Sequence, residues 1–166
     1  MVRILISACL AGEPVRYNGA DKRVEDEILA RWRDEGRLVV VCPELAGGLG
    51  VPRPPSEIIG EGGGLAVLQG TAQVEDLHGR NVTPALVAGA HEALEMARRN
   101  NVGAAVLTDR SPSCGSTTIH DGTFGSGMKP GLMGVAAALL GSHGIAVFNE
   151  HSLAAADRFV RDLESK

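Results

Sequence analysis

Short aliphatic runs alternate along this chain with longer stretches in which apolar residues recur at helical spacing. The runs cover residues 3–7, 38–41, 104–108 and 145–148. Runs of this kind, apolar almost throughout, are typical of strands covered on both faces. Strands that alternate with helices predict βαβ units and a parallel sheet. We therefore expect an α/β fold, a three-layer sandwich with a mostly parallel sheet flanked by helices.

The expected helices follow from the spacing of apolar residues and from start and stop signals. Thr83 followed by Pro84 predicts a helix start with Thr83 as the N-cap. Gly36 is well placed to end the first helix. The expected helices cover residues 21–35, 83 to about 100, 131–140, and the residues after Ser152.

The segment from residue 43 to residue 82 is rich in glycine and proline, and we expect a small β-hairpin there. Its strands would lie near residues 56–60 and 65–68 and turn at the three glycines 62–64. Residues 109–130 are expected to form a long loop. A chain of 166 residues suggests one domain, so we expect a single α/β domain over residues 1–166.

Charge and hydropathy narrow the range of partners and locations. The net charge is −4 and there is no basic block, which argues against DNA as a partner, because phosphate contacts dominate binding to duplexes. No apolar run reaches the roughly 18 residues of a transmembrane helix, and residues 1–10 resemble a first strand more than a signal peptide. We expect a cytoplasmic protein without a membrane partner, either a monomer or a homodimer.

Cys9, Cys42 and Cys114, the three cysteines of the chain, each follow a predicted strand. Ligand sites of open parallel α/β sheets lie outside the carboxyl ends of the strands, so the three thiols are expected at one edge of the sheet. A free cysteine often packs as a small hydrophobic residue, but three of three at strand ends favour a shared site. Reduced thiols and an odd count argue against a disulfide framework.

The spacing of the cysteines leaves the chemistry of this site open. Three thiolates could hold a catalytic zinc ion with one open position, as in a zinc-dependent hydrolase or deaminase, although the Cys-x-x-Cys spacing of zinc deaminases is absent. They could equally hold three irons of an iron–sulfur cluster, in an enzyme or in a non-enzymatic sensor. Metal-free thiol catalysis is a further alternative.

Several short motifs in a fixed order resemble one known family, DUF523, whose characterised members are thiouracil desulfidases. The resemblance covers nearly the whole chain, roughly residues 4–150, and includes all three cysteines. The motifs are Ser7-Ala-Cys9-Leu, Arg16-Tyr-Asn-Gly19, Cys42-Pro-Glu44, Gly47-Gly-Leu49, Pro52-Arg-Pro-Pro-Ser-Glu57, Ser111-Pro-Ser-Cys-Gly115 and Asp121-Gly122.

The resemblance implies a [4Fe-4S] cluster held by Cys9, Cys42 and Cys114, with one iron left open. It implies conversion of a thiolated uracil, such as 2-thiouracil, into uracil and sulfide without net redox change, through a transient [4Fe-5S] species. The family's catalytic carboxylate and serine match Glu44 and Ser111. Longer relatives with an additional domain act on thiouridine, so a free base or small thioamide is the substrate expected here.

The residues around these motifs supply further candidates. Glu44 lies two residues after Cys42, where a carboxylate could activate an attacking water. His120 is not counted, because a lone histidine is more often a packing residue. The candidates for contact with the substrate are Ser7, Arg16, Tyr17, Arg53 and Ser113.

Overall fold

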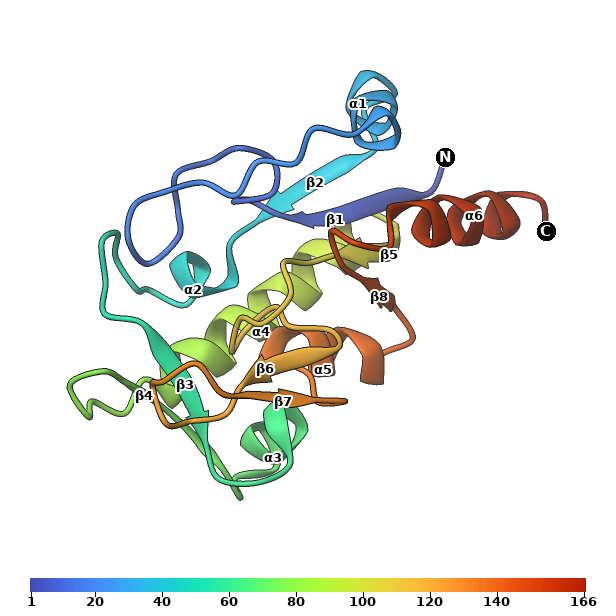
Figure 1. Cartoon of the computed structure of the whole chain (residues 1–166). Coiled ribbons are helices and arrows are strands. Elements are labelled where there is room, and N and C mark those ends of the chain that lie inside the picture. Colours follow the sequence, from blue (N-terminus) through green and yellow to red (C-terminus); the bar gives the residue numbers. More distant parts are fainter.

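A computed structural model describes residues 1–166 and has an α/β fold (Figure 1). Its main sheet consists of β1 (Arg3–Ser7), β2 (Leu38–Val41), β5 (Val102–Val106) and β8 (Ala146–Phe148). The strand order is β2-β1-β5-β8, and each neighbouring pair is parallel. The predicted parallel sheet is therefore confirmed.

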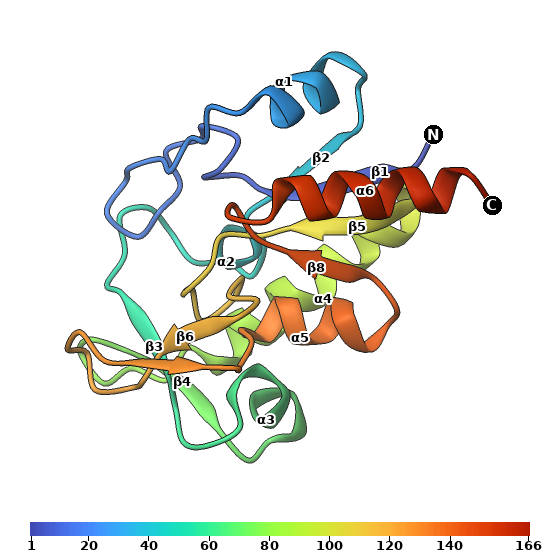
Figure 2. The same cartoon turned by 45° about the vertical axis from the view of Figure 1, so that its right-hand side comes forward.

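Helices cover both faces of this sheet, as Figures 1 and 2 show. Helices α1 (Glu27–Asp34) and α6 (Leu153–Glu164) lie on one face, and α4 (Thr83–Arg99) and α5 (Val135–Ser142) on the other. Successive strand residues point to opposite faces. Ile4 and Ile6 of β1 accordingly belong to the apolar core beneath α1 and α6, whereas Leu5 belongs to the core beneath α4 and α5. The three-layer sandwich expected from the sequence is confirmed.

The local signals place some helix ends correctly and one wrongly. Asp26 caps α1 by accepting a hydrogen bond from the backbone N–H of Ile28 at 2.7 Å, and Gly36 follows the helix with a left-handed φ of 70°. The N-cap of α4 is Val82, not Thr83. The Thr83 hydroxyl instead accepts a 2.8 Å hydrogen bond from the Val74 N–H, so it ties the helix start to the neighbouring strand.

The glycine-rich segment contains a hairpin-like pair, but its second strand lies elsewhere than expected. Strand β3 (Ser56–Ile59) pairs antiparallel with β4 (Gln73–Asp76), while residues 63–69 form the helix α3 (Gly63–Gln69). The strand expected at residues 65–68 is therefore wrong. Gly62 and Gly63 have φ values of 94° and 64°, which turn the chain into a helix that buries Ala66 and Val67.

A second antiparallel pair, β6 (Thr118–His120) and β7 (Met128–Pro130), lies inside the region expected to be a loop. These strands have only three residues each, too few for an alternating pattern to be recognised in a sequence. The pair lies beside β3, near the carboxyl edge of the main sheet (Figure 1).

The short helix α2 (Pro43–Ala46) leaves β2 directly and crosses α4 at very close range. A methyl group on Gly89 would overlap the carbonyl oxygen of Pro43, and one on Gly47 would overlap the carbonyl oxygen of Ala85. Only glycine permits this approach of the two backbones. The crossing fixes the position of α2 and of the residues that it carries.

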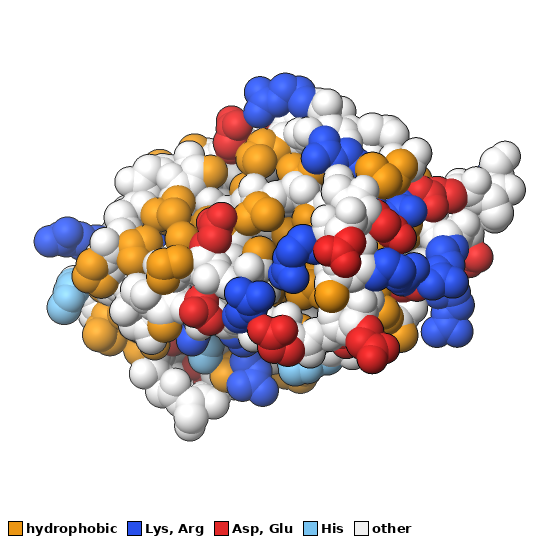
Figure 3. All heavy atoms as spheres, turned by 90° about the horizontal axis from the view of Figure 1, so that it is seen from above, with side chains coloured by type: hydrophobic (Ala, Val, Ile, Leu, Met, Phe, Trp, Pro, Cys, Tyr) orange, Lys and Arg blue, Asp and Glu red, His pale blue; other side chains and the backbone are white.

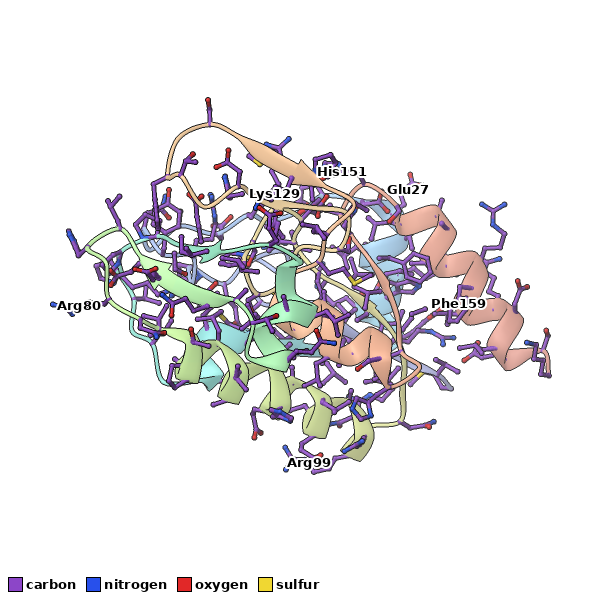
Figure 4. The ribbon with its side chains drawn as sticks, turned by 90° about the horizontal axis from the view of Figure 1, so that it is seen from below. Glu27, Arg80, Arg99, Lys129, His151 and Phe159 are labelled. Carbon is purple, nitrogen blue, oxygen red and sulfur yellow. The ribbon has the colours of Figure 1, made fainter.

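The outer surface carries charges of both signs. In Figure 3, which views the molecule from above, lysine and arginine side chains lie among aspartate and glutamate side chains. One ion pair links two helices: Arg31 of α1 lies 2.6 Å from Asp157 of α6. Seen from below in Figure 4, Arg80 and Arg99 project outward from the β4–α4 connection and the end of α4. None of the helices combines the length and the apolar character that crossing a membrane requires.

Candidate active site

A cavity of about 620 Å³ lies at the carboxyl edge of the main sheet. Cys9, two residues after β1, Cys42, directly after β2, and Cys114, in the loop after β5, all line it. None of the three forms a disulfide, and Cys9 and Cys114 are buried. The prediction that the fold brings these thiols together is confirmed in its geometry.

Backbone turns hold the cysteines in place. The Cys9 carbonyl accepts hydrogen bonds from the backbone N–H groups of Gly12 and Lys22, which close the turn after β1. Cys42 is the N-cap residue of α2, with Pro43 in the first turn. The backbone N–H of Cys114 donates to the Ser111 hydroxyl at 3.1 Å.

Burial makes the thiolate forms of the cysteines unfavourable in the protein alone. Desolvation raises the pKa of Cys9 to about 11; nearby Cys42 acts in the same direction, and Lys22 and Arg16 oppose it. Desolvation also raises the pKa of Cys42 and places the pKa of Cys114 far above the usual range of a thiol. A bound cationic centre would favour the thiolates and reverse this preference.

The arrangement of the thiols indicates which kind of centre fits. No group of three or more His, Cys, Asp or Glu side chains is arranged to hold a metal ion. Three thiol side chains that line one cavity supply the donor set that iron–sulfur clusters use. The residues present therefore fit a cluster.

Glu44 and Arg53 form an ion pair in the cavity wall. Arg53 Nε donates to Glu44 Oε2 at 2.7 Å, and the two side chains are only 9% (Arg53) and 13% (Glu44) exposed. The remaining Arg53 nitrogens donate to the carbonyl oxygens of Gly50 and Val15, each at 3.1 Å. Arg53 lines the cavity as expected, and through these three hydrogen bonds its guanidinium positions Glu44.

The serines of the predicted site are mostly engaged in holding the cysteine loops. Ser111 lines the cavity, and its hydroxyl accepts hydrogen bonds from the backbone N–H groups of Ser113 and Cys114. The Ser7 hydroxyl accepts from the Thr108 N–H at 2.9 Å, and its proximity to Cys114 counteracts part of the rise in the pKa of the Cys114 thiol. Ser113 is fully buried, and it is not among the residues that line the cavity.

Arg16 and Tyr17 lie at the cavity as expected, with the Arg16 guanidinium 5.8 Å from the centre of the Tyr17 ring. The backbone N–H of Arg53 donates to the Tyr17 carbonyl at 2.7 Å. The loop that carries Arg16 and Tyr17 is therefore anchored to the same arginine that holds Glu44.

Sequence reasoning assigned no role to several other residues of the cavity wall. Lys22 donates to Thr108 Oγ1 at 2.9 Å and pairs at 3.2 Å with Glu150, whose side chain is 5% exposed. Glu57 stood within a recognised motif, but nothing in the sequence marked it as facing the site. The unassigned residues of the wall include Lys22, Glu57, Asp109, His120 and Phe124.

The fold and the site together define an α/β protein whose free thiols share a cavity with an ion-paired carboxylate. Residues 4–152 match the family model of 2-thiouracil desulfurase, so this chain belongs to that family and is an enzyme. The resemblance to DUF523 is thereby confirmed.

Two relatives extend this assignment. The chain is 45% identical over 150 residues to the protein YbbK of Bacillus subtilis (strain 168), and the match covers 90% of this chain and 97% of that protein. It is similar to the solved structure of the [4Fe-4S]-dependent thiouracil desulfidase TudS, with a TM-score of 0.86, 37% identity and 100% coverage of both chains.

Proposed function

We propose that this protein is an iron–sulfur thiouracil desulfidase. It would convert a 2-thiouracil-like base and water into the corresponding uracil and hydrogen sulfide, with no net oxidation or reduction. The observation that carries the proposal is the convergence of three unpaired thiols and the Glu44–Arg53 pair in one cavity of a chain of this family. The [4Fe-4S] dependence of the similar enzyme TudS supports the choice of cofactor.

Cys9, Cys42 and Cys114 would hold the cluster. A [4Fe-4S] cluster with three protein ligands supplies one iron without a protein ligand, a soft Lewis acid suited to a thiocarbonyl sulfur. Lys22 and Arg16, which favour the thiolate of Cys9, supply positive charge beside this group. The form of the cluster that carries a fifth sulfide stays a prediction of the family resemblance.

Glu44 is the group proposed to take the proton of the attacking water. Arg53 holds Oε2 at 2.7 Å, while Oε1 makes no hydrogen bond within the protein and is free to accept one. Proton transfer by a placed carboxylate contributes about 10²–10⁴ in rate. Glu44→Gln should therefore slow turnover by roughly that factor, about 3–5 kcal/mol in the barrier.

Ser111 is proposed to donate a hydrogen bond to the substrate. Two backbone N–H groups occupy the lone pairs of its hydroxyl oxygen, so the hydroxyl proton is what it can offer to a ligand. Arg16 and Tyr17 are proposed as further contacts of the base. Ser7, which also lines the cavity, is proposed to act on Cys114, and Ser113, which does not line the cavity, is not assigned to the base.

The test is anaerobic reconstitution with iron and sulfide, followed by iron quantitation and an assay for uracil and sulfide from 2-thiouracil. About four irons per chain and sulfide release are expected, both lost in Cys9→Ala, Cys42→Ala and Cys114→Ala and both kept in the surface control Ser165→Ala. Bound iron without sulfide release would refute 2-thiouracil as the substrate. Stoichiometric zinc with no iron would refute the iron–sulfur cluster as the cofactor.

A further inference from the structure

Two polar side chains of the cavity wall, Glu57 of β3 and His120 of β6, take no part in the proposed chemistry. The resemblance to the family assigns neither of them a role. Each has one polar atom fixed or enclosed by the protein and a second one that is available. Their donor and acceptor properties therefore indicate what the cavity can recognise.

Glu57 is a buried carboxylate with one oxygen in use. Only 7% of the residue is exposed, and its Oε1 accepts hydrogen bonds from the backbone N–H groups of Gly122 at 2.9 Å and Phe124 at 3.3 Å. Its Oε2 makes no hydrogen bond within the protein, and it is not one of the enclosed unpartnered atoms. A buried acceptor of this kind is satisfied when a donor that enters the cavity hydrogen-bonds to it.

His120 has the opposite character. Its Nδ1 is enclosed and has no hydrogen-bond partner. A protonated ring would place a buried N–H and part of a positive charge there without an acceptor, whereas the neutral ring with its proton on Nε2 leaves only a lone pair unpaired. His120 therefore presents Nε2–H as a donor, and Nε2 is not enclosed.

The acceptor and the donor belong to segments that are packed together. Strand β3 contacts β6, and Gly122, two residues after His120, donates to Glu57. A methyl group on Gly122 would overlap the carbonyl oxygen of Ile58, so the two backbones meet without space between them. Two neighbouring strands of the cavity wall thus offer an acceptor on β3 and a donor on β6.

We propose that Glu57 and His120 recognise the amide edge of the pyrimidine, an inference that rests on the proposed function. The ring N–H would donate to Glu57 Oε2, and the neighbouring ring carbonyl would accept from His120 Nε2–H. This pair selects oxo-pyrimidines over aminopyrimidines. 2-Thiocytosine presents the reverse order at this edge, a ring nitrogen acceptor beside an amino donor.

The first test uses uracil, which has this edge and no sulfur. Its dissociation constant is measured by NMR titration of the reconstituted and the cluster-free protein. His120→Phe and Glu57→Gln should each weaken binding roughly tenfold, the effect of one lost hydrogen bond. His120→Gln keeps an N–H donor and should recover much of the affinity. His91→Phe, at an exposed position of α4, is the matched control and should bind normally.

The second test compares turnover of 2-thiouracil and 2-thiocytosine. The wild type should prefer 2-thiouracil, and Glu57→Gln should reduce this preference because the introduced side-chain amide can donate to the ring nitrogen. The amide oxygen of this variant could still accept the two backbone hydrogen bonds, and thermal unfolding checks that each variant is folded.

The outcomes separate the two proposals. Equal uracil affinity of wild type, Glu57→Gln and His120→Phe would overturn the recognition pair, as would an Nδ1–H tautomer of His120 in ¹⁵N NMR spectra, whether or not thiouracil is turned over. Absence of sulfide release by the wild type, with the expected losses of uracil affinity, would refute the desulfidase function and leave the recognition pair standing.

Discussion

The Glu44–Arg53 pair allows a sharp test of how this site is held together. Arg53→Met removes the cation but keeps most of the side-chain volume. It leaves the Glu44 carboxylate, 13% exposed, without its 2.7 Å partner, and it removes the donors to the carbonyl oxygens of Val15 and Gly50. Glu44→Gln is the milder change, because a glutamine oxygen can still accept from Arg53.

The expected free energies follow from this geometry. Removing one partner of a buried ion pair costs about 3–5 kcal/mol, and the residual exposure places Arg53→Met near the lower end, about 3 kcal/mol. For a chain of this size that corresponds to roughly 6–12 °C in Tm. Glu44→Gln should cost about 1 kcal/mol. The double variant should cost at least ~1 kcal/mol less than the sum, because the unpaired carboxylate is gone.

The assay is urea unfolding of the reduced, cluster-free protein under anaerobic conditions, so that all variants are compared in one state. The reconstituted enzymes supply kcat and KM in parallel. Arg53→Met should lower kcat more than it raises KM, since it misplaces the carboxylate rather than removing a contact to the base. Costs that add within about 0.5 kcal/mol would show that the pair does not couple, and the positioning role of Arg53 would be refuted.

Further predictions concern the close helix crossing, the thiols and the interface between α1 and α6. Gly89→Ala should destabilise the protein by more than about 3 kcal/mol and lower kcat, because the added methyl group displaces Pro43 and with it Cys42 and Glu44. The control is Gly141→Ala, whose methyl group would meet no atom within 4 Å. This variant should be neutral or stabilising in the same unfolding assay. Burial raises the pKa values of the thiols, that of Cys9 to about 11. Because folding favours the neutral thiols, their contribution to the stability of the cluster-free protein is complete below the ordinary thiol pKa of about 8.5 and is lost as the pH rises toward 11. Unfolding between about pH 7 and 10 checks this, and a triple Cys→Ala variant should lack the decline. For Asp157, desolvation is outweighed by hydrogen bonds from Trp32 and Arg31, which hold the pKa of the carboxyl below its usual range. The ionised carboxylate therefore stabilises the folded protein above about pH 4, and this stabilisation is lost as the pH falls below that value. Asp157→Asn should flatten the acid limb of the stability curve, and an unchanged limb would contradict the assignment.

The sequence was most informative where local patterns act within a single element. The aliphatic runs of β1 and β2 were recognised because strands buried on both faces need no partner information to stand out. Placing Cys9 and Cys42 after these runs was enough to predict one shared edge, because parallel strands end together.

Local patterns failed where contacts distant in the sequence decide the outcome. Residues 65–68 are apolar enough for a strand, but packing of α3 against α5 makes them helical. Thr83 has the residue type of an N-cap, yet its hydroxyl bonds to Val74 of β4. Strands β6 and β7 exist through their pairing with each other, which three residues of sequence do not reveal.

The sequence by itself thus determined the α/β class, the parallel sheet and the three thiols at its carboxyl edge, since these follow from periodicity and from strand direction. Only the tertiary structure showed that Arg53 holds Glu44, and that Glu57 and His120 line the cavity. These assignments depend on which side chains meet across long sequence separations, and hydrogen bonds between them form only after the chain has packed.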